Sequence, residues 1–182
     1  MMAPMDQETT RLRPIDENDL AATHRWRQDM RVVETSLGRR FPNTMVTEIE
    51  WYRSLDASPF PNRIYWAVED ADSTFVGLAQ LNDVNWIHRT ASFGIWIIPD
   101  HWGRGHGRTA TAEVLRRAGE VFGLRQVRLE VLAAHATAVK LYLSLGFVEE
   151  GCKRAAALVN GSHEDVLLMR YECGCRIETG QP

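Results

Sequence analysis

The sequence predicts an α/β protein built around one mixed sheet. Apolar runs of strand length alternate with stretches of helical period, which is the pattern of strands alternating with amphipathic helices. Asn160-Gly161 separates two strand-like segments and indicates a hairpin, so part of the sheet is antiparallel. A chain of 182 residues is in the one-domain range, and we expect a domain at 10–172 between flexible tails at 1–9 and 173–182.

The first half of the chain contains the signals of a strand, two helices and two further strands. Asp16 and Asp19 have the spacing of a capping pair, which marks the start of the first helix. Apolar residues at helical spacing from Met45 to Leu55 mark the second helix. The expected elements are a strand at 10–14, helices at 17–29 and within 43–56, and strands at 64–69 and 75–85.

The second half begins with an apolar run of strand length at 91–98, which we expect to be a central strand covered on both faces. An apolar stripe with a period near 3.6 predicts a helix from Arg108 onward. The stripe consists of Ala110, Val114, Ala118 and Val121. The other expected elements are a strand at 126–132, a short helix capped by Gly146, and hairpin strands at 147–158 and 163–171.

Between that strand and that helix, Gly103, Gly105 and Gly107 occupy every second position. Glycine adopts positive φ without steric cost and lets the backbone approach a ligand closely. The unpaired N–H groups at the start of the helix and the helix dipole favour an anion. The nearby positive charge comes from Arg104, His106 and Arg108. The segment therefore predicts a phosphate site, and a pyrophosphate fits its electrostatics.

Two other phosphate-binding motifs fit less well. No Lys-Ser or Lys-Thr pair follows the glycines, which argues against a site for ATP or GTP hydrolysis. Gly105-x-Gly107-x-x-Ala110 matches a dinucleotide fingerprint, and Glu130 follows at about the spacing of a ribose-binding acid. Residues 99–104 nevertheless separate the strand from the glycines, and too little sequence follows to complete a doubly wound sheet.

Composition excludes several function classes. The 45% hydrophobic and 25% charged fractions are those of a globular protein, and a net charge of −3 gives no basic face for nucleic acid. No apolar run approaches membrane-spanning length and the first ten residues lack signal-peptide features, so we expect a cytoplasmic protein that contacts no membrane. Cys173-Gly-Cys175 has no second ligand pair at zinc spacing, and we expect no metal.

Several motifs together are specific to one family. They are the stretch 99–107, A-x-x-L-Y-x-x-x-G-F at 138–147, E-E-G at 149–151, N-G at 160–161 and D-x-L-L-M at 165–169. Their order and spacing resemble the GNAT family of N-acetyltransferases, in particular the branch with ribosomal-protein, spermidine and nucleotide-amino-sugar acetyltransferases. The resemblance implies a single-domain, three-layer sandwich whose mixed, mostly antiparallel sheet splays between strands four and five.

The resemblance also implies that acetyl-CoA threads the opening in the sheet as co-substrate. Its pantetheine arm would pair with the backbone of the fourth strand, and its pyrophosphate would lie on the N–H groups of the glycine loop. His135 and Trp102 depart from the family's usual Asn and Gln or Arg, but neither change removes a backbone N–H. The residues expected to bind acetyl-CoA are Ile95, Trp96, Ile97, Ile98, Trp102, Gly103, Arg104, Gly105, His106, Gly107, Arg108, His135, Ala138 and Lys140.

The expected catalytic residues are Tyr142, His88 and Ser92. Tyr142 occupies the family's tyrosine position, which implies a general acid for the leaving thiolate, although its helical spacing also fits simple packing. Ser92 stands where the spermidine branch often has Glu, which leaves the general base open. His88 or His101 is the alternative base, directly or through a water.

The predicted reaction is direct transfer of an acetyl group to a primary amine of a small molecule in a ternary complex. An amino sugar or nucleotide amino sugar is favoured, because Trp26-Arg27-x-Asp29 and Glu50-Trp51-Tyr52 resemble that class. The arginines proposed for a nucleotide phosphate are Arg31, Arg39, Arg40 and Arg53.

Three alternatives stay open at this point. One is a polyamine acceptor, attracted by Glu34, Glu48 and Glu50. Another is a protein N-terminus as acceptor. The last is a CoA-binding module without catalysis, for which the absence of a Glu at Ser92 is the best support. A homodimer is also left open as the assembly.

Overall fold

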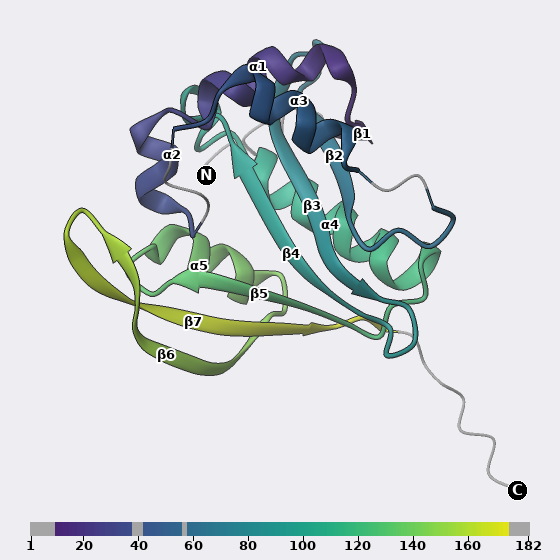
Figure 1. The fold of residues 1–182 in the computed structure, drawn as a ribbon. Helices are drawn as coiled ribbons and strands as arrows, with labels where there is room; N and C mark the ends of the chain where they lie inside the picture. The colour runs from purple at the N-terminus through teal and green to yellow at the C-terminus, as the bar shows by residue number, and fades with distance from the viewer. Residues whose placement is uncertain (1–9, 38–41, 56–57, 175–182) are drawn as a thin grey trace, which may run out of the picture.

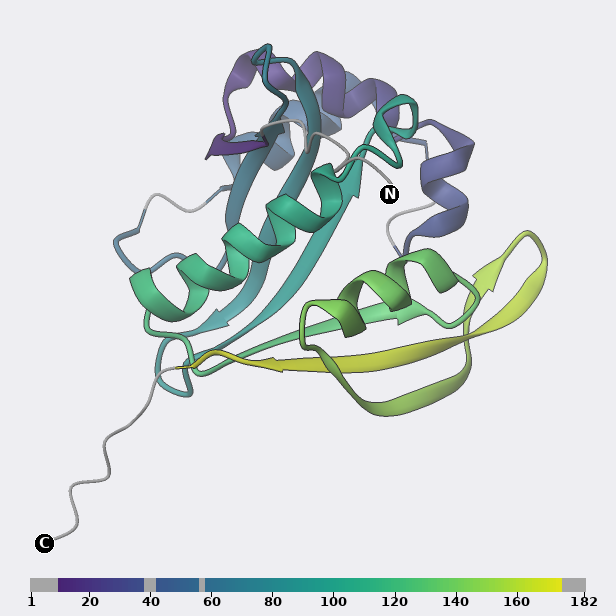
Figure 2. The same ribbon diagram turned by 180° about the vertical axis from the view of Figure 1, so that it is seen from behind.

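The computed structural model describes residues 10–37, 42–55 and 58–174. Within them, seven strands form one sheet in the order β1-β2-β3-β4-β5-β7-β6 (Figure 1). The pair β4 and β5 is parallel, and the other neighbours are antiparallel. Helices cover both faces of the sheet (Figures 1 and 2), which confirms the predicted three-layer arrangement with a mixed, mostly antiparallel sheet.

The strands agree closely with the sequence prediction. They are β1 (Arg11–Pro14), β2 (Ile64–Glu69), β3 (Phe75–Asn85), β4 (Thr90–Ile97), β5 (Gln126–Leu132), β6 (Val148–Val159) and β7 (Ser162–Glu172). The predicted bounds of β2, β3 and β5 are confirmed without a shift. The predicted hairpin turn is also confirmed, because Asn160 and Gly161 have φ of 48° and 80°, as a two-residue turn of the right twist requires.

The helices differ more from the prediction. They are α1 (Leu20–Trp26), α2 (Met30–Thr35), α3 (Met45–Arg53), α4 (His106–Arg116) and α5 (Ala136–Ser144). The single helix expected over 17–29 is wrong, because α1 ends at Trp26 and α2 follows as a separate helix. The Asp29 carboxylate accepts a hydrogen bond from the Arg31 N–H at 2.9 Å and so begins α2.

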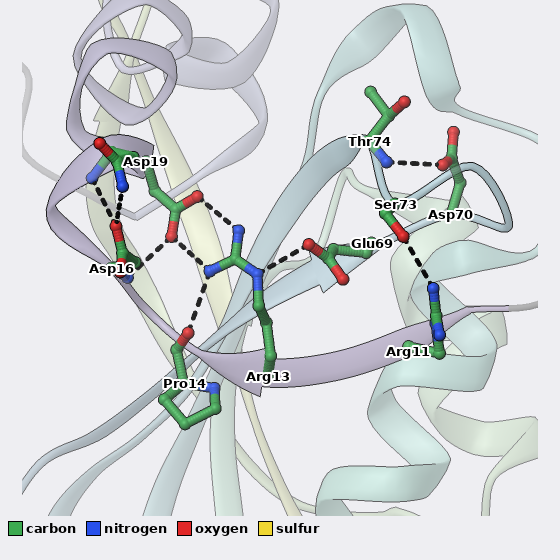
Figure 3. A network of polar contacts seen from close by, with 10 residues as sticks. Arg11, Arg13, Pro14, Asp16, Asp19, Glu69, Asp70, Ser73 and Thr74 are labelled. Carbon is green, nitrogen blue, oxygen red and sulfur yellow. Dashed lines mark hydrogen bonds and ion pairs between the residues drawn. The ribbon is translucent and has the colours of Figure 1, made fainter.

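Carboxylates hold the first helical segment against the sheet. Asp16 Oδ1 accepts from the Asn18 N–H at 2.8 Å, and Asp19 Oδ2 accepts from the Asp16 N–H at 2.8 Å, which confirms the predicted capping pair. The buried Asp19 binds both terminal nitrogens of Arg13 at 2.7 Å, and Arg13 Nε donates to Glu69 at 2.7 Å (Figure 3). Arg13 therefore joins β1 to both β2 and the start of α1.

Two apolar cores lie on the two faces of the sheet, and alternate residues of β4 divide between them. Ile95 and Ile97 pack on the core beneath α4 and α5, whereas Trp96 and Ile98 pack on the smaller core with Trp26. The expectation that 91–98 is covered on both faces is only partly right. Ala91 and Phe93 are buried, but the residues from Gly94 to Ile98 are only partly buried.

The predicted apolar stripe of α4 is right at three positions and wrong at the last. Ala110, Val114 and Ala118 are buried, but Val121 is 62% exposed. The helix continues as a π-helical turn, Arg117–Val121, which holds more residues per turn than an α-helix and so rotates Val121 out of the stripe.

The sheet opens between β4 and β5, as predicted. These strands pair at three positions only, Thr90, Ala91 and Ser92 with Gln126, Val127 and Arg128. Beyond Ser92 the strands diverge (Figures 1 and 2). The backbone of β4 from Phe93 onward therefore has no strand partner on that side among the described residues.

Candidate active site

The opening between the two strands is a cleft of about 1170 Å³. Its walls come from β4, the glycine loop, β5, the start of α5 and the end of α2. Ligand sites in proteins commonly have volumes of roughly 300 to 1,000 Å³, so this cleft has room for a large ligand. None of the described helices is long and apolar enough to cross a membrane. In the described ranges, no three His, Cys, Asp or Glu side chains are grouped as a metal site would require.

The glycine loop has the backbone conformation that its sequence predicts. Gly103 and Gly105 have φ of 78° and 90°, a region that other residues rarely adopt. Gly105 directly precedes α4 and provides no side-chain cap, so the first-turn N–H groups of the helix face the loop. Gly107 lies inside α4, and a Cβ there would stand 3.8 Å from the side chains of Ile97 and Leu141. The loop therefore presents an anion site at the mouth of the cleft.

Most residues expected to bind acetyl-CoA do line the cleft. They are Ile95, Trp96, Ile97, Trp102, Gly103, Gly105, His106, Gly107, Arg108, His135 and Ala138. Ile98, Arg104 and Lys140 lie outside the lining. Ile98 faces the opposite core, Arg104 donates to the Asp100 carbonyl at 3.3 Å, and Lys140 is on the exposed side of α5. The structure therefore does not bring these three side chains to the cleft lining.

The positive charge around the loop is smaller than expected. Arg108 lines the cleft and donates to Ser144 Oγ at 2.6 Å, which ties α4 to α5. The His106 ring is buried, and its Nδ1 lies 3.0 Å from Thr10 Oγ1 of the chain segment before β1. Trp102 Nε1 donates to the Ile97 carbonyl at 2.7 Å and so joins the loop to the end of β4. Arg108 is therefore the predicted cation whose side chain is best placed for a phosphate.

Tyr142 lies on α5 with its ring in the core and lines the cleft. Phe93 and Phe147 pack edge-on against it, with ring centroids at 6.4 and 5.6 Å. Burial raises the pKa of Tyr142 to about 12, so its hydroxyl is protonated at neutral pH. No residue in the described ranges hydrogen-bonds this hydroxyl. The two sequence-based readings of Tyr142, packing and a role in the site, are thus compatible.

The three candidates for a base lie in different places. His88 is exposed in the turn between β3 and β4, where its N–H donates to Asn85 Oδ1 at 2.8 Å. It does not line the cleft, so the structure does not bring it together with the other predicted catalytic residues. Ser92 lines the cleft at the last β4–β5 pair, and His101 lines it near the glycine loop. The His101 Nδ1 is buried and has no hydrogen-bond partner in the part of the chain that the structure describes.

Polar side chains that were not predicted line the side of the cleft away from α4 and α5. Gln80 and Asn82 from β3 stand beside Ser92 and Gly94 of β4. The strand period of two places Gln80 and Asn82 on one face, which is the signal that identifies them. Two of the carboxylates that line the cleft, Glu130 and Glu150, are paired. Glu130 accepts from Lys153 at 2.5 Å, and the arginines that pair with Glu150 are Arg128 at 3.5 Å and Arg170 at 2.9 Å.

A second cavity of about 220 Å³ adjoins the cleft. The two share Val32, Ser36 and Trp96, and helices α1, α2 and α3 provide most of the other walls. The Arg27 guanidinium lies over Trp51 at 4.5 Å, and its distances to the Trp26 and Trp96 rings are 5.6 and 5.9 Å. We call this space the Arg27 cavity. It was not predicted as a unit, although Trp26, Arg27 and Trp51 were singled out in the sequence.

The carboxylate of Glu48, one of the three proposed to attract a polyamine, lines this cavity but is already engaged by other side chains. Glu48 is 1% exposed. Its Oε1 accepts from Thr23 Oγ1 at 2.6 Å and lies 3.3 Å from Arg27 Nε, and its Oε2 accepts from Asn43 Nδ2 at 2.5 Å. Burial lowers the pKa of Arg27, and the Glu48 charge opposes that change. Glu48 is therefore a partner of Arg27.

The arginines proposed for a nucleotide phosphate do not form a site. Arg31 is paired with Asp29 at 2.7 Å and Asp100 at 3.0 Å, and its guanidinium lies outside both cavities. Arg53 is exposed on α3. Arg39 and Arg40 lie outside the described residues. Of the two described arginines, Arg31 and Arg53, neither lines a cavity.

His135 connects the two walls of the cleft. It precedes α5, is half-buried, and hydrogen-bonds with the backbone of Thr35 at the end of α2. Burial lowers the pKa of His135, and the hydrogen bond partly offsets that effect. The ring is thus neutral at pH 7 and links α2 to α5 across the cleft.

Three features together define an α/β fold that binds a nucleotide thioester. They are the open sheet, the loop of positive-φ glycines at a helix N-terminus, and the tyrosine beside the cleft. The model of the family described as "Acetyltransferase (GNAT) domain" matches residues 10–148. The chain belongs to this family, which confirms the resemblance.

Curated relatives include two spermidine N(1)-acetyltransferases. The one from Vibrio cholerae is 38% identical over 104 residues, which cover 57% of this chain and 60% of that protein. The one from Escherichia coli is 29% identical over 102 residues, covering 56% of this chain and 55% of that protein. The matched stretch thus spans less than two thirds of these relatives. A ribosomal-protein-serine acetyltransferase from Escherichia coli matches at 24% identity over 97 residues, 53% of this chain and 54% of that protein.

Solved structures match over more of the chain. The spermidine N-acetyltransferase from Vibrio cholerae, in complex with CoA and spermine, superposes with a TM-score of 0.84 at 29% identity. The superposition covers 90% of this chain and 95% of that one. A dodecameric structure of the same enzyme has a TM-score of 0.79 at 29% identity and covers 94% of this chain and 98% of that one.

Proposed function

We propose that this protein is an acetyl-CoA dependent N-acetyltransferase that acts on a primary amine of a small molecule. One observation carries the proposal. The edge of β4 is unpaired beyond Ser92 and leads into a left-handed glycine loop at the start of α4, with Tyr142 across the same cleft. This arrangement provides a backbone edge for an amide-rich arm, N–H groups for a diphosphate and a protonated phenol near the thioester.

Each part of the donor has a matching surface. The pantetheine arm carries amide groups, which pair with the backbone edge of β4 that has no strand partner beyond Ser92. The pyrophosphate lies on the N–H groups that begin α4, where the helix dipole and Arg108 favour negative charge. Because most of these contacts are made by the main chain, the unusual Trp102 and His135 do not prevent donor binding.

The chemistry is one substitution at the thioester carbonyl. The neutral amine nitrogen forms a bond to the carbonyl carbon, and a β4 backbone N–H stabilises the oxygen as it gains charge. The C–S bond then breaks and the thiolate leaves with the electron pair, while the nitrogen loses its extra proton and the thiolate gains one, so that the products are a neutral amide and a free thiol. A thiol has an ordinary pKa near about 8.5, so Tyr142 with a pKa of about 12 stabilises the thiolate chiefly as a hydrogen-bond donor.

The attacking amine must also lose a proton. An alkylammonium with a pKa near about 10 is neutral in only roughly one molecule in a thousand at pH 7. Ser92 cannot act as a base at neutral pH by itself, and it can only position a water. His101 and His106 line the cleft near the glycine loop, and His106 Nδ1 already lies 3.0 Å from Thr10 Oγ1. We therefore assign proton removal to His101 or to a water that it orders.

The relatives make a polyamine the first acceptor to test. Two curated relatives and the superposed complex carry spermidine or spermine in their names. They shift the preference away from the amino sugar that the sequence favours. An oxygen-bearing amine such as an amino sugar remains the second candidate, because Glu130, Glu150 and Glu48 are all paired with cations of the chain.

A free-thiol release assay with acetyl-CoA tests the reaction. The panel contains spermidine, glucosamine, a nucleotide amino sugar and a short peptide, and mass spectrometry identifies each product. We expect thiol release that depends on an amine, with a mass gain of one acetyl group. If acetyl-CoA stabilises the protein against heat but no amine is consumed, the chain is a CoA-binding module and the proposal is wrong.

The assembly stays a prediction. A homodimer was left open by the sequence, and a related enzyme from Vibrio cholerae is described as dodecameric. Light scattering on the purified protein, with and without spermidine, distinguishes a monomer, a dimer and a larger ring.

A further inference from the structure

The Arg27 cavity contains chemistry that the transfer reaction does not use. It lies on the face of β4 opposite to Tyr142, because Trp96 turns toward it whereas Ile95 and Ile97 turn toward the other core. It opens to the cleft at Val32, Ser36 and Trp96. A molecule whose amine reaches β4 from this side would place its remaining atoms in the Arg27 cavity.

Arg27 supplies hydrogen-bond donors to this cavity. A guanidinium has five N–H groups, and the described residues accept a hydrogen bond from none of those on Arg27. The nearest carboxylate oxygen, Glu48 Oε1, is 3.3 Å from Nε. The side chain is 26% exposed, and its flat faces are covered by indole rings at 4.5 to 5.9 Å. The edge of the guanidinium therefore remains open to an oxygen acceptor.

Trp26 supplies a second donor. It lines the same cavity and is 5% exposed, and its Nε1 is buried. That N–H has no hydrogen-bond partner anywhere in residues 10–37, 42–55 or 58–174. Buried indole N–H groups usually have a partner, because leaving one unpaired costs free energy. An acceptor oxygen bound in the cavity would satisfy this donor.

The cavity is unsuited to an ammonium group. Both oxygens of Glu48 are already engaged, by Thr23 and Asn43 as donors and by Arg27 as counter-ion. A second cation would stand beside Arg27 without a carboxylate to pair with it, and like charges at short range repel each other. Arg27 already lies over an indole face of this cavity, so the rings favour the carbon atoms of a ligand over a second cation.

The volume limits the size of the bound group. A cavity of about 220 Å³ corresponds to the liquid volume of roughly seven water molecules. That is space for one small polar group and its carbon frame, and it is too small for a whole nucleotide.

We propose that the Arg27 cavity holds an oxygen-bearing group of the acceptor, a carboxylate or hydroxyl groups close to the amine, through Arg27 and the Trp26 N–H. This inference rests on the proposed function and makes its second candidate acceptor the preferred one. Arg27 and Trp26 are then specificity-determining residues, and an oxygen-free polyamine lacks the group that they bind.

Steady-state kinetics with three amines test the proposal. Glucosamine offers hydroxyls, β-alanine offers a carboxylate, and spermidine offers neither. We expect the wild-type protein to have a kcat/KM at least tenfold higher for glucosamine or β-alanine than for spermidine. The two oxygen-bearing amines separate hydroxyl from carboxylate recognition.

Two variants and a matched control locate the effect. Arg27→Gln should raise KM for the preferred oxygen-bearing amine at least tenfold and leave KM for acetyl-CoA unchanged, whereas KM for spermidine should not rise. Trp26→Phe keeps the ring and removes only the unpartnered N–H, so it should raise the same KM several-fold with no fall in melting temperature. Arg25→Gln, at an exposed position of α1, should change none of these values.

The outcomes separate the two proposals. If spermidine is the best substrate of the wild-type protein, or if Arg27→Gln and Trp26→Phe behave like Arg25→Gln, the Arg27 proposal is wrong while the acetyltransferase function stands. If Arg27→Gln unfolds, the Trp26→Phe result decides alone. If no amine is acetylated by a folded protein that binds CoA, the proposed function itself is wrong.

Discussion

The donor side and the acceptor side of the cleft are built from different parts of the chain. The donor side consists mainly of main chain: the unpaired edge of β4, the positive-φ glycines Gly103 and Gly105, and the N–H groups that begin α4. The acceptor side consists of side chains, with the indoles and the guanidinium of the Arg27 cavity at one end and paired charges of β5 and β6 at the other.

This difference explains why family membership identifies the donor but not the acceptor. Main-chain groups persist when side chains change, so a site made from them survives departures such as His135 and Trp102. A site made from side chains changes its ligand with one or two substitutions. Membership in the GNAT family therefore indicates the donor, whereas the acceptor must be inferred from residues such as Arg27.

A change at Tyr142 should have the largest effect. Tyr142 is a side chain on the donor side of the cleft, and we expect it to affect the transfer reaction but not the binding of CoA. We expect Tyr142→Phe to lower kcat about 100-fold, since removing one preorganised hydrogen-bond donor to a developing negative charge typically costs roughly that much. The Kd of CoA should not change, because the ring still packs between Phe93 and Phe147. Steady-state turnover assays measure kcat, and calorimetric titration measures the Kd of CoA. Unchanged turnover would show that Tyr142 only packs.

Glu48 tests whether the acceptor side depends on its own internal pairing. Glu48→Ala leaves Thr23, Asn43 and Arg27 without their partner, and we expect it to lower the free energy of unfolding by about 2 kcal/mol. The figure is below that of a fully buried pair because Arg27 is partly exposed. Urea unfolding measures it. Glu50→Ala, at an exposed position of the same helix, is the control and should stay within about 0.5 kcal/mol of the parent.

Gly105 tests whether the donor side depends on backbone conformation. Its φ of 90° strains any residue with a Cβ, so Gly105→Ala should raise the Kd of CoA about tenfold. Gly123→Ala introduces comparable strain at a φ of 64°, outside the cleft lining, and should lower stability without changing the Kd. Equal effects of the two variants on CoA binding would contradict the loop's assignment.

His135 gives the smallest expected effect and tests the contact between the two sides. Its pKa is lowered in the folded protein, so below about pH 6.5 the unfolded chain binds more protons than the folded one. The free energy of unfolding of the wild-type protein should therefore fall relative to that of His135→Asn as the pH falls below 6.5. Above that pH, the difference between the two proteins should not depend on pH. Urea unfolding at pH 7.5 and 5.0 measures it, and His163→Asn, at an exposed position of β7, controls for the loss of an imidazole. A constant difference at both pH values would refute the expectation.

The parts that were predictable from sequence are those set by local chemistry. Apolar runs of strand length located β2, β3 and β5, and the spacing of glycines located the positive-φ loop. Helix α2 was not predictable, because it has six residues and Val32 is the buried one among them, which is too few to show a period. The short β4–β5 pairing was expected from the family resemblance and not from any local signal.

The site residues that could not be predicted depend on contacts between distant segments. Glu48 lies on an amphipathic helix, and its sequence neighbours do not reveal that Thr23, Asn43 and Arg27 surround it. His88 has a suitable chemical group but lies at the far end of a hairpin, which its spacing could not show. The sequence thus shows the chemical type of these residues but not which other residues surround them.

Three residue pairs join the halves of the sheet directly, and this has a thermodynamic consequence. A molecule that bonds to the free edge of β4 and rests against β5 takes the place of the strand contacts that are missing there, and so becomes a structural component of the protein while it is bound. The amide hydrogens of β4 that point to its free edge should then exchange with solvent much more slowly in the presence of CoA, and the two halves should melt as one unit.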